Sequence, residues 1–239
     1  MAQYRLGVLG GMGPQATNTF YQFIIDRTDA SCDQEHVDAL ILSDSGMPDR
    51  TAAILGSDEA KKRVYARLLA DARLLEGAGC TAIAVPCNTS HYFLDRVQEQ
   101  IGIPIIHMIR ETAKSLAARG LRRPGILATD GTIRTGLYQK EFAALGIEAV
   151  VPSPEAQDLV MSLIYEDIKA GRDGDPHKFA AIHRDLLAQG CDCGVLACTE
   201  LSVFATAHHL PPFYTDAMAV LAERSVEACH RPLREIFIK

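Results

Sequence analysis

Short apolar runs recur along the chain, separated by longer stretches that have a helical period. The clearest runs span residues 5–9, 37–42 and 81–85. They are rich in valine, leucine and isoleucine, as strands are when both faces of a parallel sheet are covered. We therefore expect buried parallel strands at these three positions.

One stretch, residues 58–78, shows the helical period clearly. It begins with acidic residues and ends at glycines, and both features are typical of helix termini. Its apolar side chains fall near one stripe, which we expect to be buried: Val64, Leu68, Leu69, Leu74 and Leu75. Strands that alternate with such helices predict an α/β fold, in which helices cover both faces of a mainly parallel sheet.

Three segments of the first half of the chain return in the second half, in the same order. The matched pairs are 5–9 with 123–127, 79–87 with 190–198, and 103–106 with 210–213. One match alone would mean little, because parallel strands commonly share glycine and aliphatic residues. Three ordered matches predict two similar lobes. We place the first lobe at residues 1–112 plus 218–239 and the second at 113–217, because a helical segment ends at Gly120.

The motif LGGMGPQAT, residues 9–17, follows the first predicted strand and fits the G-x-G-x-x-G/A pattern of dinucleotide-binding turns. That interpretation also needs an acid about 20 residues further on, at the end of the second strand. The second strand instead ends at Asp44, 33 residues after Gly11. A dinucleotide site is therefore disfavoured. The motif predicts a turn whose glycines let backbone N–H groups point at a small anion such as a carboxylate.

Composition narrows the class of protein. The 239 residues carry 24 Lys and Arg against 30 Asp and Glu, so no broad positive field suggests nucleic acid or an anionic membrane as partner. No apolar stretch approaches the roughly 20 residues of a membrane span, and the N-terminus lacks a signal-segment pattern. The seven cysteines are an odd number in a chain too long to need disulfides. We expect a soluble cytoplasmic protein with reduced thiols.

The spacing of the cysteines disfavours a metal site. Cys191 and Cys193 form a close pair, but no second pair or histidine cluster stands at the spacing of a structural zinc site. Most cysteines in such a chain are small buried hydrophobic residues. We therefore expect no metal.

Two cysteines, Cys87 and Cys198, stand directly after equivalent predicted strands. Polar residues follow each of them, in the motifs PCNTSH (86–91) and CTE (198–200). Ligands bind at the carboxyl ends of parallel strands, and amides at the start of the following helices would lower the pKa of both thiols. If a substrate carbon lay between them, one thiolate would remove a proton from one face and the other thiol would deliver one to the opposite face. The configuration of the carbon would be inverted.

Five motifs, in order along nearly the whole chain, resemble those of the aspartate/glutamate racemase superfamily, most closely its cofactor-independent aspartate racemases: LGGMGPQAT, MPDRTA, VPCNTSH, GTIRTGLYQ and ACTELS. The resemblance implies an α/β fold of two pseudo-symmetric lobes, each a mainly parallel sheet flanked by helices, with the active site in the cleft between them. It also implies a homodimer that uses neither pyridoxal phosphate nor a metal.

The resemblance implies catalytic roles for Cys87 and Cys198, and carboxylate binding by Arg50 with help from Lys169. It further implies substrate-binding positions at Met12, Asn88, Thr89, Thr129, Thr199 and Glu200. Met12 and Glu200 replace an acid and a histidine of the glutamate racemase branch, which favours the aspartate branch. Each polar position also has a purely structural interpretation: a solvated loop for Arg50, a solvated helix face for Lys169, and helix capping for the asparagine and threonines.

These observations predict a racemase of aspartate or a related acidic amino acid. Two alternatives remain: a cis/trans isomerase of a small dicarboxylate such as maleate, with one cysteine as nucleophile, and a two-lobed protein that binds a small ligand without catalysis. His91 suggests a Cys-His arrangement with Cys87, but four residues further along a helix we expect it to be a capping or surface residue.

Overall fold

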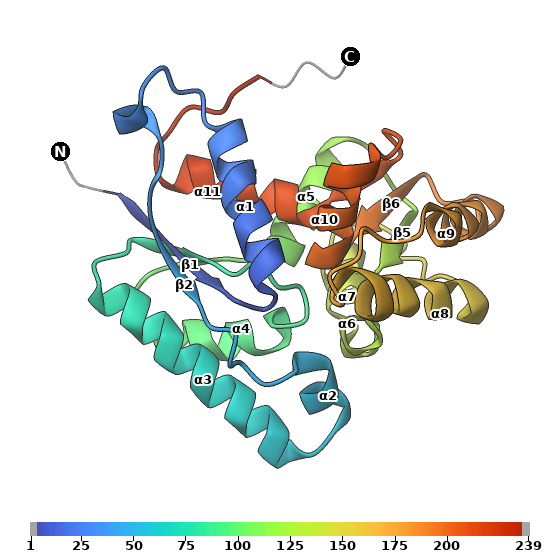
Figure 1. Cartoon of the computed structure of the whole chain (residues 1–239), viewed down its shortest axis with the longest axis horizontal. Helices are drawn as coiled ribbons and strands as arrows, with labels where there is room; N and C mark the ends of the chain where they lie inside the picture. Colours follow the sequence, from blue (N-terminus) through green and yellow to red (C-terminus); the bar gives the residue numbers. More distant parts are fainter. Residues whose placement is uncertain (1–3, 236–239) are drawn as a thin grey trace.

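Two parallel sheets organise the chain, and helices pack against both of them (Figure 1). The computed structural model describes residues 4–235, so the outermost ends of the predicted first lobe lie outside the described residues. The first sheet has the order β2-β1-β3-β4 and the second the order β5-β6-β7. The strands are β1 (Arg5–Gly10), β2 (Asp38–Ser43), β3 (Ala82–Ala84), β4 (Ile105–Ile106), β5 (Pro124–Leu127), β6 (Cys193–Leu196) and β7 (Tyr214–Asp216).

Helices connect the strands in both halves. In the first half they are α1 (Pro14–Arg27), the 3-10 turn η1 (Asp33–Glu35), α2 (Arg50–Leu55), α3 (Asp58–Gly77), α4 (His91–Gln98) and α5 (Met108–Ala118). In the second half they are α6 (Asp130–Thr135), α7 (Leu137–Ala143), α8 (Pro154–Ser162), the π-helical segment η2 (Leu163–Ile168), α9 (Pro176–Ala188), α10 (Thr199–His208) and α11 (Ala217–Ala228). Within residues 4–235, no helix is long and apolar enough to cross a bilayer.

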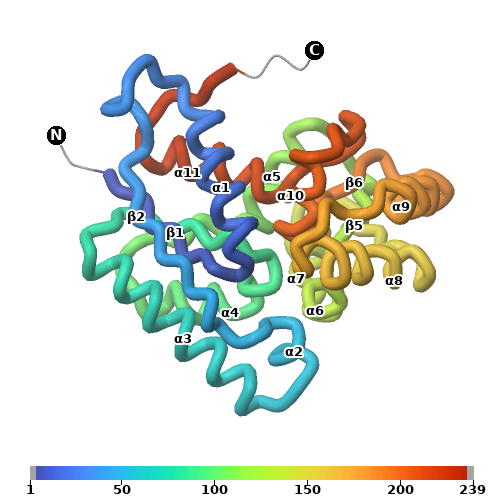
Figure 2. The backbone as a smooth tube through the Cα atoms, viewed as in Figure 1, coloured from blue at the N-terminus to red at the C-terminus, as the bar shows by residue number. Residues whose placement is uncertain are grey.

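The last helix joins the two halves. α11 returns from β7 to pack on α1 and α5, which Figure 2 shows as the red tube beside the blue one. A continuous buried cluster runs from Leu6 and Phe20 of the first half to Val195 of the second and includes Leu221 of α11. The two sheets therefore share one hydrophobic core. Two further clusters cover the outer faces, one under α3 and α4 and one under α8 and α9.

The register of the strands agrees with the predicted repeat at two of its three matches. Leu6 pairs with Ala82 in the first sheet, and Pro124 pairs with Cys193 in the second, and these are the residues that the first two matches make equivalent. The counterpart of β2 is reduced to one parallel bridge between Gly125 and Val150. Both lobes therefore have the same arrangement around the central strand.

The third match is wrong by two residues. Gly194 pairs with Tyr214 as Ile83 pairs with Ile105, so the equivalent of Ile105 is Tyr214 rather than Pro212. A turn closed by the Tyr214 amide on the carbonyl of Pro211 precedes β7. Proline has no N–H to contribute to a sheet, so the strand begins after the prolines.

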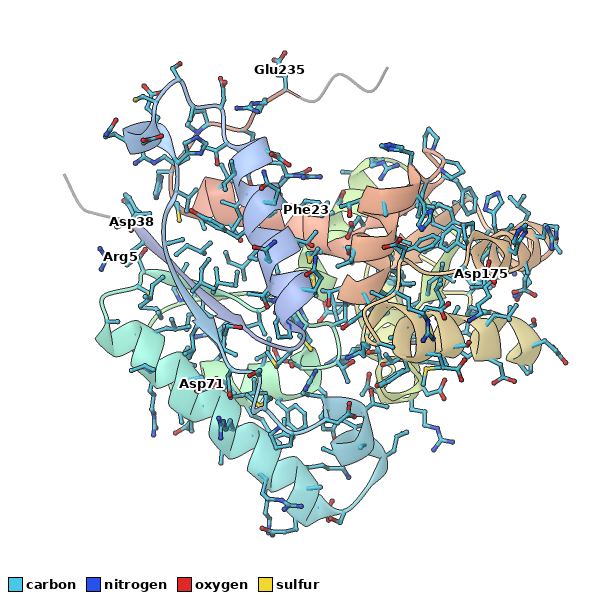
Figure 3. The ribbon with its side chains drawn as sticks, in the orientation of Figure 1. Arg5, Phe23, Asp38, Asp71, Asp175 and Glu235 are labelled. Atoms are coloured by element: carbon cyan, nitrogen blue, oxygen red, sulfur yellow. The ribbon has the colours of Figure 1, made fainter. Side chains whose placement is uncertain are left out.

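The predicted strands are confirmed, but β2 is not buried. It is the edge strand of the first sheet, and Leu40 and Ile41 are each 38% exposed because only one neighbouring strand covers them. At the start of this edge, Arg5 of β1 forms an ion pair with Asp38 at 3.1 Å (Figure 3).

The predicted helix is confirmed as α3, with one error in its buried stripe. Val64, Leu68 and Leu75 are buried, but Leu74 is 59% exposed. The stripe continues through Ala72, four residues after Leu68, as the helical period requires. The predicted limit between the lobes, at 112/113, falls inside α5, which packs on both α11 and α7. The division into lobes at these residues stays a prediction.

Candidate active site

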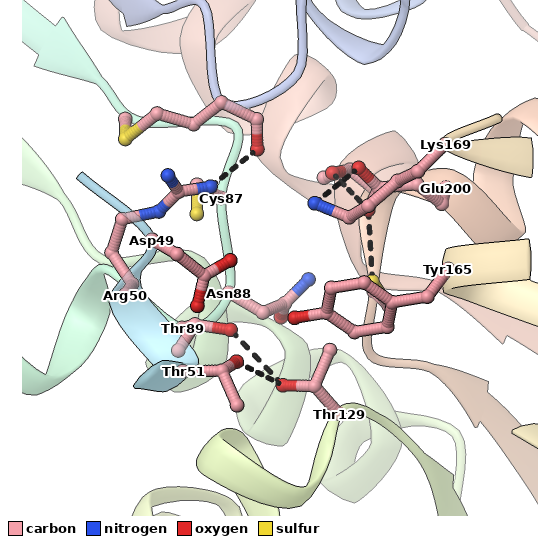
Figure 4. A pocket seen from close by; sticks show the side chains of 13 residues that line it. Asp49, Arg50, Thr51, Cys87, Asn88, Thr89, Thr129, Tyr165, Lys169 and Glu200 are labelled. Atoms are coloured by element: carbon pink, nitrogen blue, oxygen red, sulfur yellow. Dashed lines mark hydrogen bonds and ion pairs between the residues drawn. The ribbon is translucent and has the colours of Figure 1, made fainter. Parts of the chain in front are cut away.

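A small cavity lies where the carboxyl ends of the two sheets meet (Figure 4). All of the predicted site residues line it: Met12, Arg50, Cys87, Asn88, Thr89, Thr129, Lys169, Cys198, Thr199 and Glu200. They come from loops that follow β1, β2, β3, β5 and β6 and from the end of η2. The cavity volume is about 10 Å³, which is room for about one water molecule. An amino acid enters only if the walls of the cavity move apart.

Arg50 lies beside Cys87 on the first-lobe side. It is the first residue of α2, and the helix is capped by Asp49, whose Oδ1 accepts from the Ala52 amide at 2.6 Å. Arg50 is 8% exposed, and its guanidinium donates to the carbonyls of Pro48 at 3.1 Å and Met12 at 3.2 Å. A solvated loop charge is therefore the wrong interpretation of Arg50.

Arg50 lines the cavity with a charged guanidinium and, within residues 4–235, has one buried donor without a partner. Burial lowers its pKa, but nearby Cys87, Asp49 and Glu200 outweigh burial and leave the pKa raised, so the guanidinium stays charged. Among the described residues, its buried Nε has no hydrogen-bond partner. A buried donor without a partner is costly, and an anion in the cavity would satisfy it.

Cys198 has a different environment on the second-lobe side. Its thiol donates to Oε2 of Glu200 at 2.9 Å, and Oε1 of Glu200 pairs with Nζ of Lys169 at 3.2 Å. Burial first, and then the Glu200 carboxylate, raise the pKa of Cys198 well above its ordinary value. The expected lowering of this pKa by helix amides is therefore wrong, because burial and a neighbouring anion outweigh those dipoles.

Lys169 owes its position to the irregular turn before it. The π-helical segment η2 ends at Ile168, and the amide of the next residue, Lys169, donates to the carbonyl of Ile164 at 2.9 Å. Such turns often occur at functional sites because they redirect one side chain. The ammonium group lies 5.2 Å from the centre of the Tyr165 ring. Burial lowers the pKa of Lys169, but Glu200 and Cys198 outweigh burial, so the pKa is raised and the lysine stays charged.

A cluster of threonine hydroxyls crosses from one lobe to the other. Thr89 contacts Thr129 at 3.2 Å and Thr132 at 2.9 Å, and Thr51 donates to Thr129 at 3.3 Å. Thr129 also caps α6 through the Thr132 amide. The capping interpretation of Thr129 is thus confirmed, and the same hydroxyl lines the cavity.

Asn88 offers a second buried donor to the cavity. Its Oδ1 accepts from the hydroxyl of Tyr138 at 2.5 Å, which fixes the side-chain amide. In residues 4–235, its buried Nδ2 has no partner. Asn88 Nδ2 and Arg50 Nε are therefore two buried N–H donors that line one small cavity.

His91 is neither a surface residue nor a free base. It is 1% exposed, and its Nδ1–H donates to the carbonyl of Cys87 at 2.9 Å while Nε2 accepts from the Met108 amide at 3.0 Å. Burial first, and then His107, lower the pKa of His91 to about 3. The neutral ring therefore ties the Cys87 turn to the first residue of α5.

Gly10 and Gly11 of the opening motif serve packing. The Gly11 amide donates to Oγ1 of Thr17 at 2.8 Å, so the expectation that it points at a ligand is wrong. A Cβ on Gly10 would lie 2.3 Å from Thr17, and Gly11 has φ of +87°, which favours glycine. Met12 contributes mainly its carbonyl, which holds Arg50.

Sequence reasoning missed three residues of the cavity wall: Asp49, Thr51 and Tyr165. Asp49 and Thr51 flank Arg50 in the motif MPDRTA, and Tyr165 precedes Lys169 by one helical turn. Both kinds of proximity are signals that would have found them. Among residues 4–235, no group of three or more His, Cys, Asp and Glu side chains is arranged to hold a metal ion.

Comparisons with known proteins agree with this arrangement. The family model of Asp/Glu/hydantoin racemases matches residues 9–224. The broad specificity amino-acid racemase RacX of Bacillus subtilis is 28% identical over 225 residues, which cover 92% of this chain and 96% of that protein.

Solved structures extend the agreement to the fold. Aspartate racemase of Picrophilus torridus has a TM-score of 0.81 at 27% identity and covers 97% of this chain and 96% of its own. A glutamate racemase from Thermus thermophilus shares the fold, with a TM-score of 0.64 at 21% identity over 95% of this chain and 81% of its own. This chain is therefore an amino-acid racemase that belongs to the Asp/Glu/hydantoin racemase family.

Proposed function

We propose that the protein racemises aspartate, or a related acidic amino acid, by proton transfer between two thiols and without pyridoxal phosphate. The observation that carries the proposal is the pairing of two cysteines with two cations around one cavity. Cys87 lies beside Arg50, and Cys198 lies near Lys169 through Glu200. Thiols serve as acid and base at the substrate carbon, and cations hold its carboxylates.

The proton transfer needs one thiolate and one thiol at a time. The thiolate removes the α-proton and becomes a thiol, and the electron pair stays on the substrate carbon. The opposite thiol then gives its proton to the other face and becomes a thiolate. Cys87 and Cys198 follow equivalent strands of opposite lobes, which suits attack from two faces.

An acidic substrate matches the charges of the cavity. Arg50 Nε and Asn88 Nδ2 are buried donors that one carboxylate would satisfy. Lys169 would pair with a second carboxylate. A substrate with two carboxylates therefore suits this cavity better than an apolar amino acid does. The likeness to an aspartate racemase supports aspartate, and the likeness to a broad specificity racemase makes a wider panel part of the test.

The direct test is incubation of the purified protein with L-aspartate, followed by separation of the enantiomers by chiral chromatography. L-glutamate and several neutral amino acids form the comparison panel. We expect D-aspartate to accumulate without added cofactor, and activity to persist after dialysis against a chelator and treatment with a carbonyl reagent. Racemisation of neutral amino acids only would overturn the acidic specificity, and no racemisation of any amino acid would overturn the function.

The resemblance of the motifs also leads us to propose a homodimer. Sedimentation equilibrium of the purified chain measures its mass directly. A mass of one chain at micromolar concentration would contradict this proposal.

A further inference from the structure

Glu200 stands between the small inner cavity and a larger outer cavity beside it. The outer cavity has a volume of about 560 Å³ and lies between the start of α1 and the chain around 168–173. Glu200 and Lys169 line both cavities. One side chain therefore touches a thiol on its inner side and an outer space that is large enough for many water molecules.

The two oxygens of Glu200 have different partners. Oε2 accepts from the Cys198 thiol at 2.9 Å, and Oε1 pairs with Lys169 at 3.2 Å. The first turn of α1 begins beside Oε1, because a Cβ on Gly13 would lie 3.7 Å from it. A helix N-terminus and an ammonium group both stabilise a carboxylate that is only 5% exposed.

Substrate binding explains this carboxylate only through the α-ammonium group of the substrate. The two carboxylates of an acidic amino acid would be repelled by Glu200 in a small cavity. The oxygen nearest the thiol already accepts its proton in a hydrogen bond. The geometry suits proton transfer from sulfur to oxygen.

We propose that Glu200 is the proton acceptor of Cys198 and exchanges this proton with water through the outer cavity. The proposal rests on the two-thiol function above. In the step, the S–H bond of Cys198 breaks and an O–H bond forms on Oε2. The pair keeps one proton and one negative charge, which Lys169 balances. The resulting thiolate then takes the α-proton of the substrate, and Glu200 later releases its own proton to water.

The two-thiol reaction creates the need for such a path. Each inversion leaves the thiol and the thiolate exchanged, so the enzyme has to regain its starting protonation before it repeats the same reaction. The inner cavity holds about one water molecule. Glu200 gives Cys198 a route for its proton to the outer cavity, and Cys87 regains a proton from the water that replaces the departing product.

Other charged and titratable groups surround the pair and enter any pH profile. On the inner side, groups that interact with Cys198, Glu200 or Lys169 come from four elements: Arg50, Cys87, Tyr138 and Tyr165. On the outer side, Arg172 and Asp173 line the larger cavity. The test therefore uses a comparison between variants at one pH.

The experiment follows exchange of the α-hydrogen of both aspartate enantiomers with deuterated water, in variants that keep one thiol. In Cys87→Ala, Cys198 is the remaining base, and we expect Glu200→Gln to slow exchange at least about tenfold. In Cys198→Ala, the same substitution measures what Glu200 contributes through Lys169 and substrate binding. The proposal requires Glu200→Gln to lower the exchange rate by a factor about tenfold larger in Cys87→Ala than in Cys198→Ala.

Whether Glu200→Gln slows or speeds exchange in Cys87→Ala distinguishes two roles of Glu200, a proton acceptor and a charge that only suppresses the thiolate. Removal of the negative carboxylate lowers the pKa of Cys198 and favours its thiolate. If Glu200 only suppresses the thiolate, Glu200→Gln will speed exchange in Cys87→Ala. A faster rate, or equal losses in the two backgrounds, would overturn the proposal. Glu200→Asp keeps an acid, so partial recovery of exchange is expected and also checks that the site folds.

A second measurement needs no substrate and so separates this proposal from the proposed function. Alkylation of each cysteine by a small reagent is followed by peptide mass spectrometry as pH rises. We expect Glu200→Gln to shift the reaction of Cys198 to lower pH, with Cys87 in the same sample as the internal comparison. An unchanged Cys198 profile overturns the coupling even if racemisation is found. A shifted profile without racemisation supports the coupled pair and contradicts only the function.

Discussion

The two cysteine turns occupy equivalent places in the two lobes but have opposite electrostatic partners. Cys87 follows β3 and lies beside the guanidinium of Arg50, and Cys198 follows β6 and donates to the carboxylate of Glu200. The backbone register of the adjacent strand pairs is the same. The comparison teaches that a repeated fold fixes where the thiols stand, whereas side chains that differ between the two lobes determine the charge that each thiol meets.

The support behind each turn also differs. Behind Cys87, the buried ring of His91 ties the turn to α5 by two hydrogen bonds. Behind Cys198, the corresponding contact is the ion pair of Glu200 with Lys169 at the end of η2. One turn is held by a neutral group and the other by a charge pair, so the two respond differently to pH and to substitution.

The largest expected effect tests whether both turns are needed. Cys87→Ala and Cys198→Ala should each lower racemisation at least about a hundredfold in both directions, because each thiol reaches only one face of the substrate carbon. Chiral chromatography from either enantiomer measures this loss. Cys32→Ala, at an exposed cysteine outside the cavity, is the matched control. A single-site variant that retains more than about a hundredth of wild-type turnover contradicts the paired mechanism.

A second test measures how the unfolding free energy depends on pH, because the Cys87 turn is held by the buried neutral ring of His91. The pKa of His91 is lowered to about 3 by burial, against its ordinary value of 6.5. Between pH 6.5 and pH 3, His91 binds a proton in the unfolded state but stays neutral in the native state. The unfolding free energy should therefore fall by up to about 1.4 kcal/mol per pH unit as pH falls below 6.5 toward 3. His91→Gln does not titrate, so its curve should be flatter. Denaturant titrations of both proteins between pH 7 and pH 4.5 measure the difference between the two stability curves.

A half-buried acid, Asp71, gives the opposite slope and cancels in that difference. Burial first, and then Asp44, raise the pKa of Asp71 to about 6. Its contribution to stability is full below the ordinary value of 3.8 and is lost as pH rises through about 6. Asp71 is present in both proteins. Identical pH curves for wild type and His91→Gln would show that His91 is not held neutral.

The third test weakens the cation of the Cys87 side while keeping its charge. Arg50→Lys loses the planar fork and the Nε donor, so kcat/KM should fall at least about tenfold, or about 1.4 kcal/mol of transition-state binding. Arg110→Lys alters an ion pair with Glu141 outside the cavity and serves as control. Steady-state kinetics with aspartate measures both. Near-native kcat/KM in Arg50→Lys would show that Arg50 does not clamp the substrate carboxylate.

The smallest expected effect concerns the hydroxyls that bridge the lobes. Thr129→Val removes the cap of α6 and the contacts with Thr51 and Thr89, and should lower the unfolding free energy by about 1 kcal/mol. Thr206→Val, on an exposed part of α10, is the control. Thermal unfolding compares them. Equal stabilities of the two variants would show that the bridge contributes nothing.

Much of the fold, and most of the residues that line the cavity, could be predicted from the sequence because both depend on local pattern. The strands and α3 have clear periods, and the residues after the strand ends meet where the carboxyl ends of the two sheets come together. The buried state of His91 did not follow, since it depends on α5, which packs from elsewhere in the chain. The raised pKa of Cys198 also depends on how the side chain of Glu200 folds back, which spacing alone does not determine.

The duplicated β-α-β arrangement has a stereochemical consequence. One lobe carries one thiol at its strand end, so on the proposed mechanism a lobe by itself would replace the α-hydrogen and return the same enantiomer. Handedness changes only when a second copy presents its thiol from across the cavity. On that mechanism the shared core through Leu6, Val195 and Leu221 also serves catalysis, because it holds the two halves so that both thiols line one cavity.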